Sequence, residues 1–371
     1  MRSAQFEIAI VGGGPAGLAV ALEAATRGHS VVVLDRRSGP IDKACGEGLM
    51  PAGLASLERL GVLAHLDQAE TSVFDSITYV QEDGRSVRAA LPAPGGLGIR
   101  RLALATAMTR RARELRVTLN ESCGVRAHRI DANGVTLTTD VGEVRAKVLV
   151  AADGLHSALR KAEGLEGVWH GPKRFGLRRH VAMTPWAPTV EVHFAPGAEA
   201  YVTPAGAQRV GLAFLWEDGR VDGTVSFETL LSRFPILEKR IAGHAFDSEP
   251  RGAGPLRQPV SARVKDRFVL VGDAAGYVDA ITGEGLSLAF DGAAALGRLW
   301  SQVLASEGSA ASLQPYEREM RRGFTRYARL ASLLVWTARR PALRRFVINR
   351  LITMPRLFEW ALARATVHER E

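Results

Sequence analysis

The sequence predicts an α/β protein built from a discontinuous first domain, a second domain dominated by a β-sheet, and a C-terminal helical extension. A buried strand that turns into a helix through a glycine-rich segment at 8–17 indicates the first domain. Alternating apolar and polar residues between 177 and 216 are typical of half-buried strands and indicate the second domain. A strand at 267–271, apolar after Arg267, then returns the chain to the first domain, which is therefore discontinuous.

The glycine-rich turn has the spacing of a dinucleotide site in a Rossmann-like domain. Gly12 permits the tight turn, Gly14 lets a pyrophosphate approach the backbone at the helix N-terminus, and Gly17 lets that helix lie close on the sheet. A second strand at 31–34 ends at Asp35, whose carboxylate can accept hydrogen bonds from an adenosine ribose. This segment fits NAD and FAD equally well.

The remaining elements follow from hydrophobic periodicity and turn residues. We expect helices at 15–27, 51–60 and 101–115, and strands at 76–87, 116–119 and 146–151, the last after a hairpin that turns at 133–134. The proline and glycine cluster at 92–98 marks a crossing between the domains. The expected division is a first domain of 1–75, 98–170 and 259–310, a sheet domain of 76–97 and 171–258, and a helical segment of 311–371.

The net charge of +9 belongs to the C-terminal segment. Residues 321–371 contain twelve Arg, three Glu and neither Lys nor Asp, a difference that equals the net charge of the whole chain. Such a segment, rich in Leu, Phe and Trp, is typical of surface helices with solvated arginines, or of cationic helices that lie on an anionic membrane. A nucleic-acid partner is not expected, because the rest of the chain is neutral overall.

The compartment expected from the sequence is the cytoplasm, with membrane association as an option for the basic segment. No apolar run reaches the roughly eighteen residues that span a bilayer, and the first strand starts too early to follow a signal peptide. Cys45 and Cys123 are the only cysteines, so we expect neither a disulfide framework nor a metal site.

Two further constellations lie at the ends of strands. In the segment 151–160, Asp153 opens an Asp-Gly turn and Arg160 follows Ser157 by one helical turn. We expect Asp153 and Arg160 to stabilise this turn and a domain contact, with a contact to NAD(P)H as the alternative.

The second constellation lies at 271–286. Asp273 ends an apolar strand and can accept a hydrogen bond from a ribityl hydroxyl, and the amides of 283–286 open a helix. A helix N-terminus stabilises the negative charge that a flavin ring acquires on reduction. This constellation therefore favours a flavin over a nicotinamide.

With these motifs in order, the chain resembles the FAD-dependent para-hydroxybenzoate hydroxylase superfamily, which includes aromatic hydroxylases, geranylgeranyl reductases and flavin-dependent halogenases. The resemblance spans about residues 5–320 and includes an R-x-x-L helix start at Arg101 and a G-D-A-A turn at Gly272. It implies an FAD-binding domain, Arg101 near the FAD phosphates, Asp273 on the ribityl chain, and NAD(P)H as the reductant without a second Rossmann lobe. The expected cofactor-binding residues are Gly12, Gly14, Pro15, Ala16, Gly17, Asp35, Arg36, Arg101, Val125, Asp153, Asp273, Gly283, Gly285 and Leu286.

The chain does not match one branch of the superfamily throughout. The K-A-C-G-E-G loop at 43–48 and the segment 276–285 resemble geranylgeranyl reductases. The Y-x-W-x-F-P motif of those reductases appears at 201–204 without its Trp and Phe, and the stretch 48–61 resembles hydroxylases. The W-x-W-x-I-P motif of halogenases is absent, which disfavours that branch.

Four residues are candidates for chemistry near the flavin. Cys45 lies in the glycine-rich loop and is either a catalytic proton donor or gate, or a packing residue. Glu284 either hydrogen-bonds in the flavin loop or favours its helix N-terminus. His180 and His193 are acid/base groups or, as we expect, structural.

These inferences predict an FAD-dependent oxidoreductase. The first expectation is an NAD(P)H-dependent monooxygenase of secondary metabolism that hydroxylates a hydrophobic aromatic or polyketide-like molecule in a pocket that excludes water. The alternative is a geranylgeranyl-reductase-like enzyme that reduces carbon–carbon double bonds of a prenyl or polyene lipid, favoured by the Cys45 loop and the basic C-terminal segment. Oxygen uptake distinguishes the two.

Overall fold

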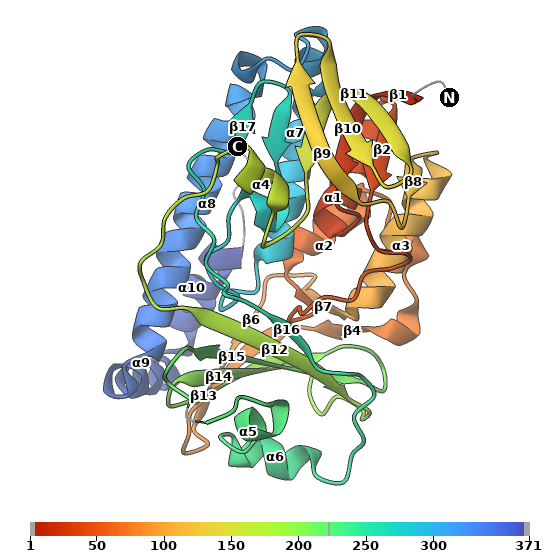
Figure 1. The fold of residues 1–371 in the computed structure, drawn as a ribbon. Helices are drawn as coiled ribbons and strands as arrows, with labels where there is room; N and C mark the ends of the chain where they lie inside the picture. The colour runs from red at the N-terminus through yellow and green to blue at the C-terminus, as the bar shows by residue number, and fades with distance from the viewer. Residues whose placement is uncertain (1–3, 222, 367–371) are drawn as a thin grey trace.

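The computed structural model describes residues 4–221 and 223–366, in which two large β-sheets lie one above the other with helices beside them (Figure 1). An 8-stranded sheet forms the first domain and a 7-stranded sheet the second, and a 3-stranded sheet lies at their junction. The α/β class predicted from the sequence is confirmed.

The first domain has a largely parallel sheet at its centre, in the order β17-β18-β11-β1-β2-β8, in which β17 pairs with β18 antiparallel. Its strands are β1 (Ala4–Val11), β2 (Val31–Leu34), β8 (Thr118–Asn120), β11 (Gly142–Ala151), β17 (Val264–Lys265) and β18 (Phe268–Leu270), and the hairpin of β9 (Val125–Asp131) and β10 (Gly134–Thr139) extends it from β11. Since β1 runs parallel to both β2 and β11, and β11 to β18, the predicted motifs that follow these strands meet at one edge.

Helices pack on the parallel sheet through small and apolar side chains. They are α1 (Pro15–Ala25), α2 (Pro51–Arg59), α3 (Arg101–Glu114), α4 (Ala158–Ala162) and α7 (Gly285–Ala305), with short 3-10 turns η1 (Leu63–His65), η2 (Gln68–Glu70) and η3 (Gly272–Ala275). Ile8 and Ile10 of β1 and Trp300 of α7 are completely buried in the core between sheet and helices. This packing fixes the N-termini of α1 and α7, which face the site described below.

The second sheet presents one face to helices and the other to the first domain (Figure 1). Its order is β16-β12-β15-β14-β13-β5-β6, with bounds β16 (Arg251–Ala253), β12 (Arg174–Val181), β15 (Val210–Glu217), β14 (Ala198–Pro204), β13 (Thr189–Ala195), β5 (Ser76–Val80) and β6 (Ser86–Ala90). Helices α5 (Phe227–Leu231) and α6 (Pro235–Ile241), which the sequence analysis did not anticipate, cover the outer face through Phe227 and Phe234.

The crossing at 92–98 contains a strand as well as a turn. Strand β7 (Gly96–Ile99) pairs with β3 (Gly48–Leu49) and β4 (Thr71–Phe74) in the small sheet. A Cβ atom on Gly98 would lie 1.5 Å from the carbonyl oxygen of Pro204, so only glycine allows this strand to approach β14. The glycines there therefore serve close packing between the sheets.

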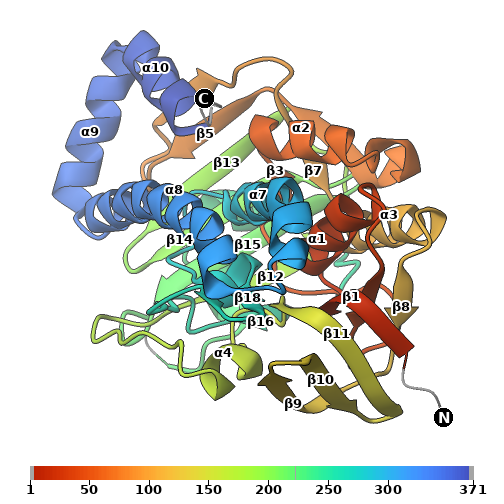
Figure 2. The same ribbon diagram turned by 90° about the horizontal axis from the view of Figure 1, so that it is seen from above.

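The C-terminal segment forms three helices, and the second and third each begin at a proline, Pro341 and Pro355. They are α8 (Ala310–Ala338), α9 (Pro341–Thr353) and α10 (Pro355–Thr366). Figure 2 shows α8 beside α7, and α9 and α10 at the periphery near the second sheet. Within the described residues, no helix combines the length and the apolar character needed to cross a bilayer.

Candidate functional site

A cavity of 1880 Å³ lies between the first domain and the second sheet. Of the cofactor-binding residues predicted from the sequence, all except Gly17 line it. Drug-sized ligands occupy pockets of about 300–1,000 Å³, so this cavity has room for more than one such molecule. One end is formed by the glycine-rich turns of the first domain, and the other by the second sheet and the C-terminal helices.

The three glycines of the first turn differ in their surroundings. Gly12 has φ +115°, and a Cβ there would lie 2.2 Å from the oxygen of Ala152; on Gly17 it would lie 2.0 Å from the oxygen of Gly12. These two glycines are required by the turn and by helix packing. A Cβ on Gly14 would meet only the Nη2 atom of Arg101, at 3.9 Å. The space in front of Gly14 is therefore open and faces a cation.

Arg101 and Asp35 flank this open space. Arg101 begins α3, is 8% exposed, and its Nε atom is buried without a hydrogen-bond partner. Asp35 accepts hydrogen bonds from the backbone N–H groups of Gly13 at 2.7 Å and Arg37 at 2.9 Å. A buried guanidinium with an unsatisfied donor beside a helix N-terminus is suited to bind a phosphate.

Arg160 joins the Asp-Gly turn at 151–160 to the G-D-A-A turn that begins at Gly272. Its buried guanidinium donates to the carbonyl oxygens of Leu155 at 2.9 Å and Ala274 at 3.1 Å, which ties the Asp-Gly turn to η3. Asp153 accepts a hydrogen bond from the backbone N–H of Leu159 at 3.2 Å. Asp153 and Arg160 thus stabilise the turn and its contact with η3, both within the first domain.

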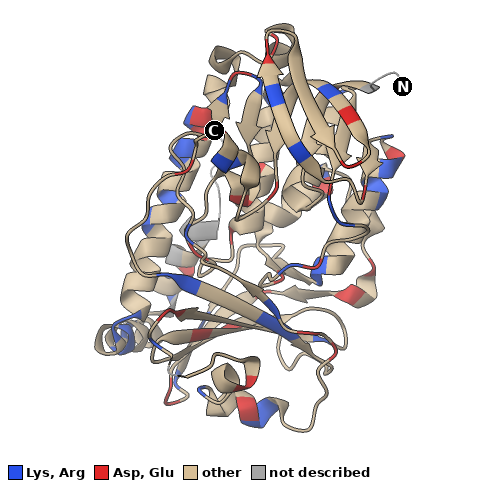
Figure 3. Cartoon of the chain, viewed as in Figure 1, with Lys and Arg blue, Asp and Glu red and all other residues tan. Residues whose placement is uncertain are grey.

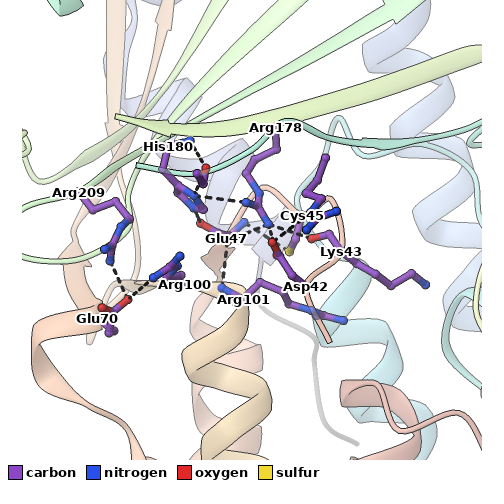
Figure 4. A network of polar contacts seen from close by, with 12 residues as sticks. Asp42, Lys43, Cys45, Glu47, Glu70, Arg100, Arg101, Arg178, His180 and Arg209 are labelled. Carbon is purple, nitrogen blue, oxygen red and sulfur yellow. Dashed lines mark hydrogen bonds and ion pairs between the residues drawn. The ribbon is translucent and has the colours of Figure 1, made fainter. Parts of the chain in front are cut away.

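The loop that carries Cys45 is fixed by a buried carboxylate, that of Glu47 (Figure 4). Its side chain is 1% exposed and lies 2.5 Å from Nε2 of His180 and 3.6 Å from Nη2 of Arg178. It also accepts a hydrogen bond at 2.9 Å from the backbone N–H of Arg101, the first residue of α3. Glu47 therefore joins the loop, the cofactor end of the cavity and the second sheet.

Glu47 has no assigned role in the sequence analysis, although the loop motif contains it. The only local signal is an acidic residue between two glycines, and its partner His180 lies 133 residues away on β12. His193 has a comparable partner, Glu191, at 2.7 Å on its own strand. Both histidines are thus paired with carboxylates, and only His180 contacts the cavity loop.

Cys45 and Glu284 bring protonated groups to the cavity. The Sγ atom of Cys45 accepts a hydrogen bond from the backbone N–H of Glu47 at 3.4 Å, and burial raises the pKa of the thiol. Burial also raises the pKa of Glu284, at the N-terminus of α7, to about 8. Both groups line the cavity and keep their protons at neutral pH. Cys123 also lines it, and both cysteines are free thiols.

The opposite end of the cavity is apolar. Its walls come from β5 and β13 of the second sheet and from all three C-terminal helices, and include Ile77, Tyr79, Val190, Phe194, Leu334, Val347, Ile348, Leu351, Phe358 and Leu362. Arg344 of α9 is buried there, over the ring of Phe194 at 5.0 Å, and pairs with Glu82. This pair ties α9 to the turn between β5 and β6.

Comparisons with known proteins agree with this geometry. A family model described as FAD binding domain matches residues 5–331. A menaquinone reductase of Mycobacterium tuberculosis is 29% identical over 359 residues, which cover 89% of this chain and 84% of that protein. A digeranylgeranylglycerophospholipid reductase of Methanopyrus kandleri is 25% identical over 366 residues, with coverages of 89% and 91%. A triple mutant of the flavin-dependent brominase Bmp2 shares the fold, with a TM-score of 0.85, 17% identity, and coverages of 99% and 96%.

Proposed function

This chain belongs to the FAD binding domain family, and we propose that it is a reductase that hydrogenates a carbon–carbon double bond in an isoprenoid lipid. Membership confirms the superfamily expected from the motifs, FAD as the cofactor, and the class of FAD-dependent oxidoreductases. The reaction, the lipid and NAD(P)H as the source of electrons are our proposal.

The observation that carries the proposal is the apolar extension of the cavity beyond its cofactor end. Aliphatic and aromatic side chains from five elements surround a space that continues from Cys45 to Phe358 and Leu362. Burial of a hydrocarbon chain there contributes about 25 cal/mol for each Å² of apolar surface removed from water. A long isoprenoid chain fits this lining better than a compact phenol, which needs several polar groups to orient it.

The relatives include lipid reductases but do not decide between reduction and hydroxylation. The menaquinone reductase and the digeranylgeranylglycerophospholipid reductase are named for lipids, and each aligns with 84% or more of its own length. The sequence motifs placed hydroxylation first, and the comparisons do not distinguish the two reactions. The shape and lining of the cavity are the reason for our preference.

The residues at the cofactor end fit FAD. The open space at Gly14 and the unsatisfied Nε of Arg101 suit the pyrophosphate, and Asp35 lies where the adenosine ribose is expected. Asp273 and the residues 283–286 also line the cavity. A reduced flavin bound by these residues would be the source of the hydride for one carbon of the double bond.

The second carbon requires a proton, which we assign to the thiol of Cys45. The raised pKa keeps this thiol protonated, and its loop borders both the cofactor end and the apolar extension. The apolar lining excludes water from the reacting carbons, and Glu47 fixes the position of the loop. The thiolate formed by the transfer recovers a proton from solvent after product release.

Substitution of Asp273 by Ala is expected to weaken FAD binding about 10- to 100-fold, because a hydrogen bond to a charged group contributes about 1.5–3 kcal/mol. Asp273 follows β18, and its carboxylate lines the cavity while its backbone is tied to Arg160 at 3.5 Å. Fluorescence titration of the FAD-free variant measures the affinity, with the exposed Asp218→Ala as a control. An unchanged affinity would contradict the ribityl role.

The proposed reaction is tested without oxygen. Purified holoprotein is incubated anaerobically with NADPH or NADH and either menaquinone or a geranylgeranylated phospholipid, and the products are weighed by mass spectrometry. We expect a product heavier by two hydrogen atoms. Oxygen uptake stimulated by the substrate, with one added oxygen atom in the product, would instead establish the hydroxylase. A third reaction uses dithionite to reduce the flavin directly. Product formed with dithionite but not with NADPH or NADH would mean that the electron donor, and not the reaction, is wrong.

A further inference from the structure

Exposed apolar side chains are concentrated on the C-terminal helices. Among the residues that the structure describes, twelve large hydrophobic side chains are exposed, and seven of them lie between 333 and 360. These seven, which we call the C-terminal patch, are Leu333, Trp336, Phe346, Ile352, Met354, Leu357 and Trp360. Large apolar side chains exposed together on consecutive helices are a feature of interaction sites.

Helix α9 has apolar residues on two faces. Ile348 and Leu351 are spaced three residues apart and line the cavity, so they form its inner face. Phe346, which is 58% exposed, lies on the opposite side, where the exposed Arg350 follows it by one turn. An ordinary surface helix would be polar on that outer face. The outer face of α9 therefore exposes an apolar ring to solvent within the described part of the chain.

The cavity opens within the C-terminal patch. Leu333 and Trp336 of α8 and Leu357 of α10 are 57%, 48% and 45% exposed, and the same three residues line the cavity. A side chain that is partly exposed to solvent and also lines the cavity lies at the cavity's rim. The apolar extension thus ends at the surface between α8 and α10, both of which lie at the edge of the molecule (Figure 2).

Arginines surround the aromatic residues of the patch. The guanidinium of Arg340 lies over the ring of Trp336 at 4.1 Å, and that of Arg350 over the ring of Phe346 at 5.4 Å. Arg356 is also exposed, and basic residues recur along α8 and α9 (Figure 3). These pairs place a positive charge at the level of an exposed ring, as amphipathic side chains do at a membrane interface.

The twelve arginines of the segment do not form a single face. Arg344 is buried against Glu82, and Arg339 pairs with Glu217 at 2.6 Å, so both stabilise the fold. The attraction of the patch for anions therefore comes from fewer residues than the sequence suggested.

We propose that the C-terminal patch docks on an anionic phospholipid bilayer, so that a lipid enters the cavity between α8 and α10 without passing through water. The arginine rim complements phosphate headgroups, and the exposed Trp and Phe rings enter the interfacial layer. A second copy of the chain on the same patch would bring two basic surfaces together. The docking goes beyond the proposed reaction, and its test needs no turnover.

The test is flotation of the FAD-bound protein with vesicles of phosphatidylglycerol or of phosphatidylcholine, at low and high salt. We expect binding to the anionic vesicles that weakens with salt, and at least a tenfold loss of binding in Phe346→Glu and in Met354→Glu. Neither residue lines the cavity. Val141→Glu, on the turn between β10 and β11 at 71% exposure, is the matched control and should bind like the wild type. Because two patch variants are tested, one of them can still be compared with the control if the other does not fold.

Three results would overturn the docking proposal. They are no binding of the wild type to anionic vesicles at low salt, equal loss of binding in Val141→Glu, or a dimer that Phe346→Glu dissociates. A separate assay compares turnover of a lipid in vesicles with turnover in detergent. If the patch variants lose turnover in vesicles but keep it in detergent, the lipid enters from the bilayer. If the wild-type protein binds vesicles but shows no turnover in either vesicles or detergent, the reductase proposal is refuted and the docking proposal is retained.

Discussion

Substitution of Gly14 by Val is expected to remove FAD from an otherwise folded protein. The backbone of Gly14 has φ −76° and ψ 174°, which a β-branched residue adopts readily, and a Cβ there would meet only Arg101 Nη2 at 3.9 Å. The chain can therefore accommodate the side chain, but the valine methyl groups occupy the space of the pyrophosphate. We expect a colourless protein with wild-type circular dichroism and an FAD affinity at least about a hundredfold lower, which corresponds to about 3 kcal/mol.

Two other glycines make this experiment specific. Gly17→Val places a Cβ 2.0 Å from the oxygen of Gly12, so it should prevent folding, with loss of FAD as a consequence. Gly323→Val, on α8, meets nothing within 4 Å and should retain both fold and flavin. A Gly14→Val protein that keeps its full flavin content would refute the pyrophosphate site.

The parts of the fold that the sequence predicts are those with local signals. The spacing of Gly12, Gly14, Gly17 and Asp35 is contained in one βαβ unit, so the sequence alone predicts strand, turn and helix. Pro341 begins a helix in the structure because its fixed φ suits the first turn. In both cases neighbouring residues determine the conformation, and no distant contact is needed.

Features that depend on distant contacts were not predictable in the same way. Strand β7 exists because Gly98 can lie against the backbone of Pro204, more than one hundred residues away, and the sequence between them shows only a cluster of glycine and proline. The pair of Glu47 and His180 likewise joins a loop to a strand of the other domain. Only the folded topology reveals that the acid of the G-E-G loop has a buried basic partner.

The same topology explains why the residue that positions Cys45 escaped the sequence analysis. Glu47 has φ +59°, and its carbonyl oxygen accepts a hydrogen bond from the N–H of Ile99 at 2.8 Å, while its own N–H donates to Cys45 Sγ. Its carboxylate faces His180 and Arg178. A residue fixed at its backbone and its side chain places the thiol at one point of the cavity wall.

Replacement of Cys45 by Ser is expected to lower turnover about 10²- to 10⁴-fold, because a hydroxyl is a far weaker acid than a thiol and a positioned general acid contributes that factor. The flavin absorption spectrum and the FAD content should change little, because the substitution exchanges one small side chain for another. Rapid-reaction measurements should show that FAD is still reduced at the wild-type rate while transfer to the lipid is slow. A wild-type turnover rate in Cys45→Ser would contradict the role as proton donor and would mean that Cys45 is a packing residue.

If Glu47 acts through Cys45, its substitution must lose its effect once the thiol is gone. Glu47→Gln keeps the size of the side chain but removes the charge that faces His180 and Arg178, and it should lower turnover in the wild-type background. In the Cys45→Ser background the same change should have little further effect, because residues that act as a unit are not additive. Glu191→Gln is the matched control: it removes the carboxylate partner of His193 in the same sheet, away from the cavity, so any loss of stability should come without loss of turnover. Additive effects of Glu47→Gln and Cys45→Ser on turnover would mean that Glu47 acts independently of Cys45, and that the loop does not depend on it to place the thiol.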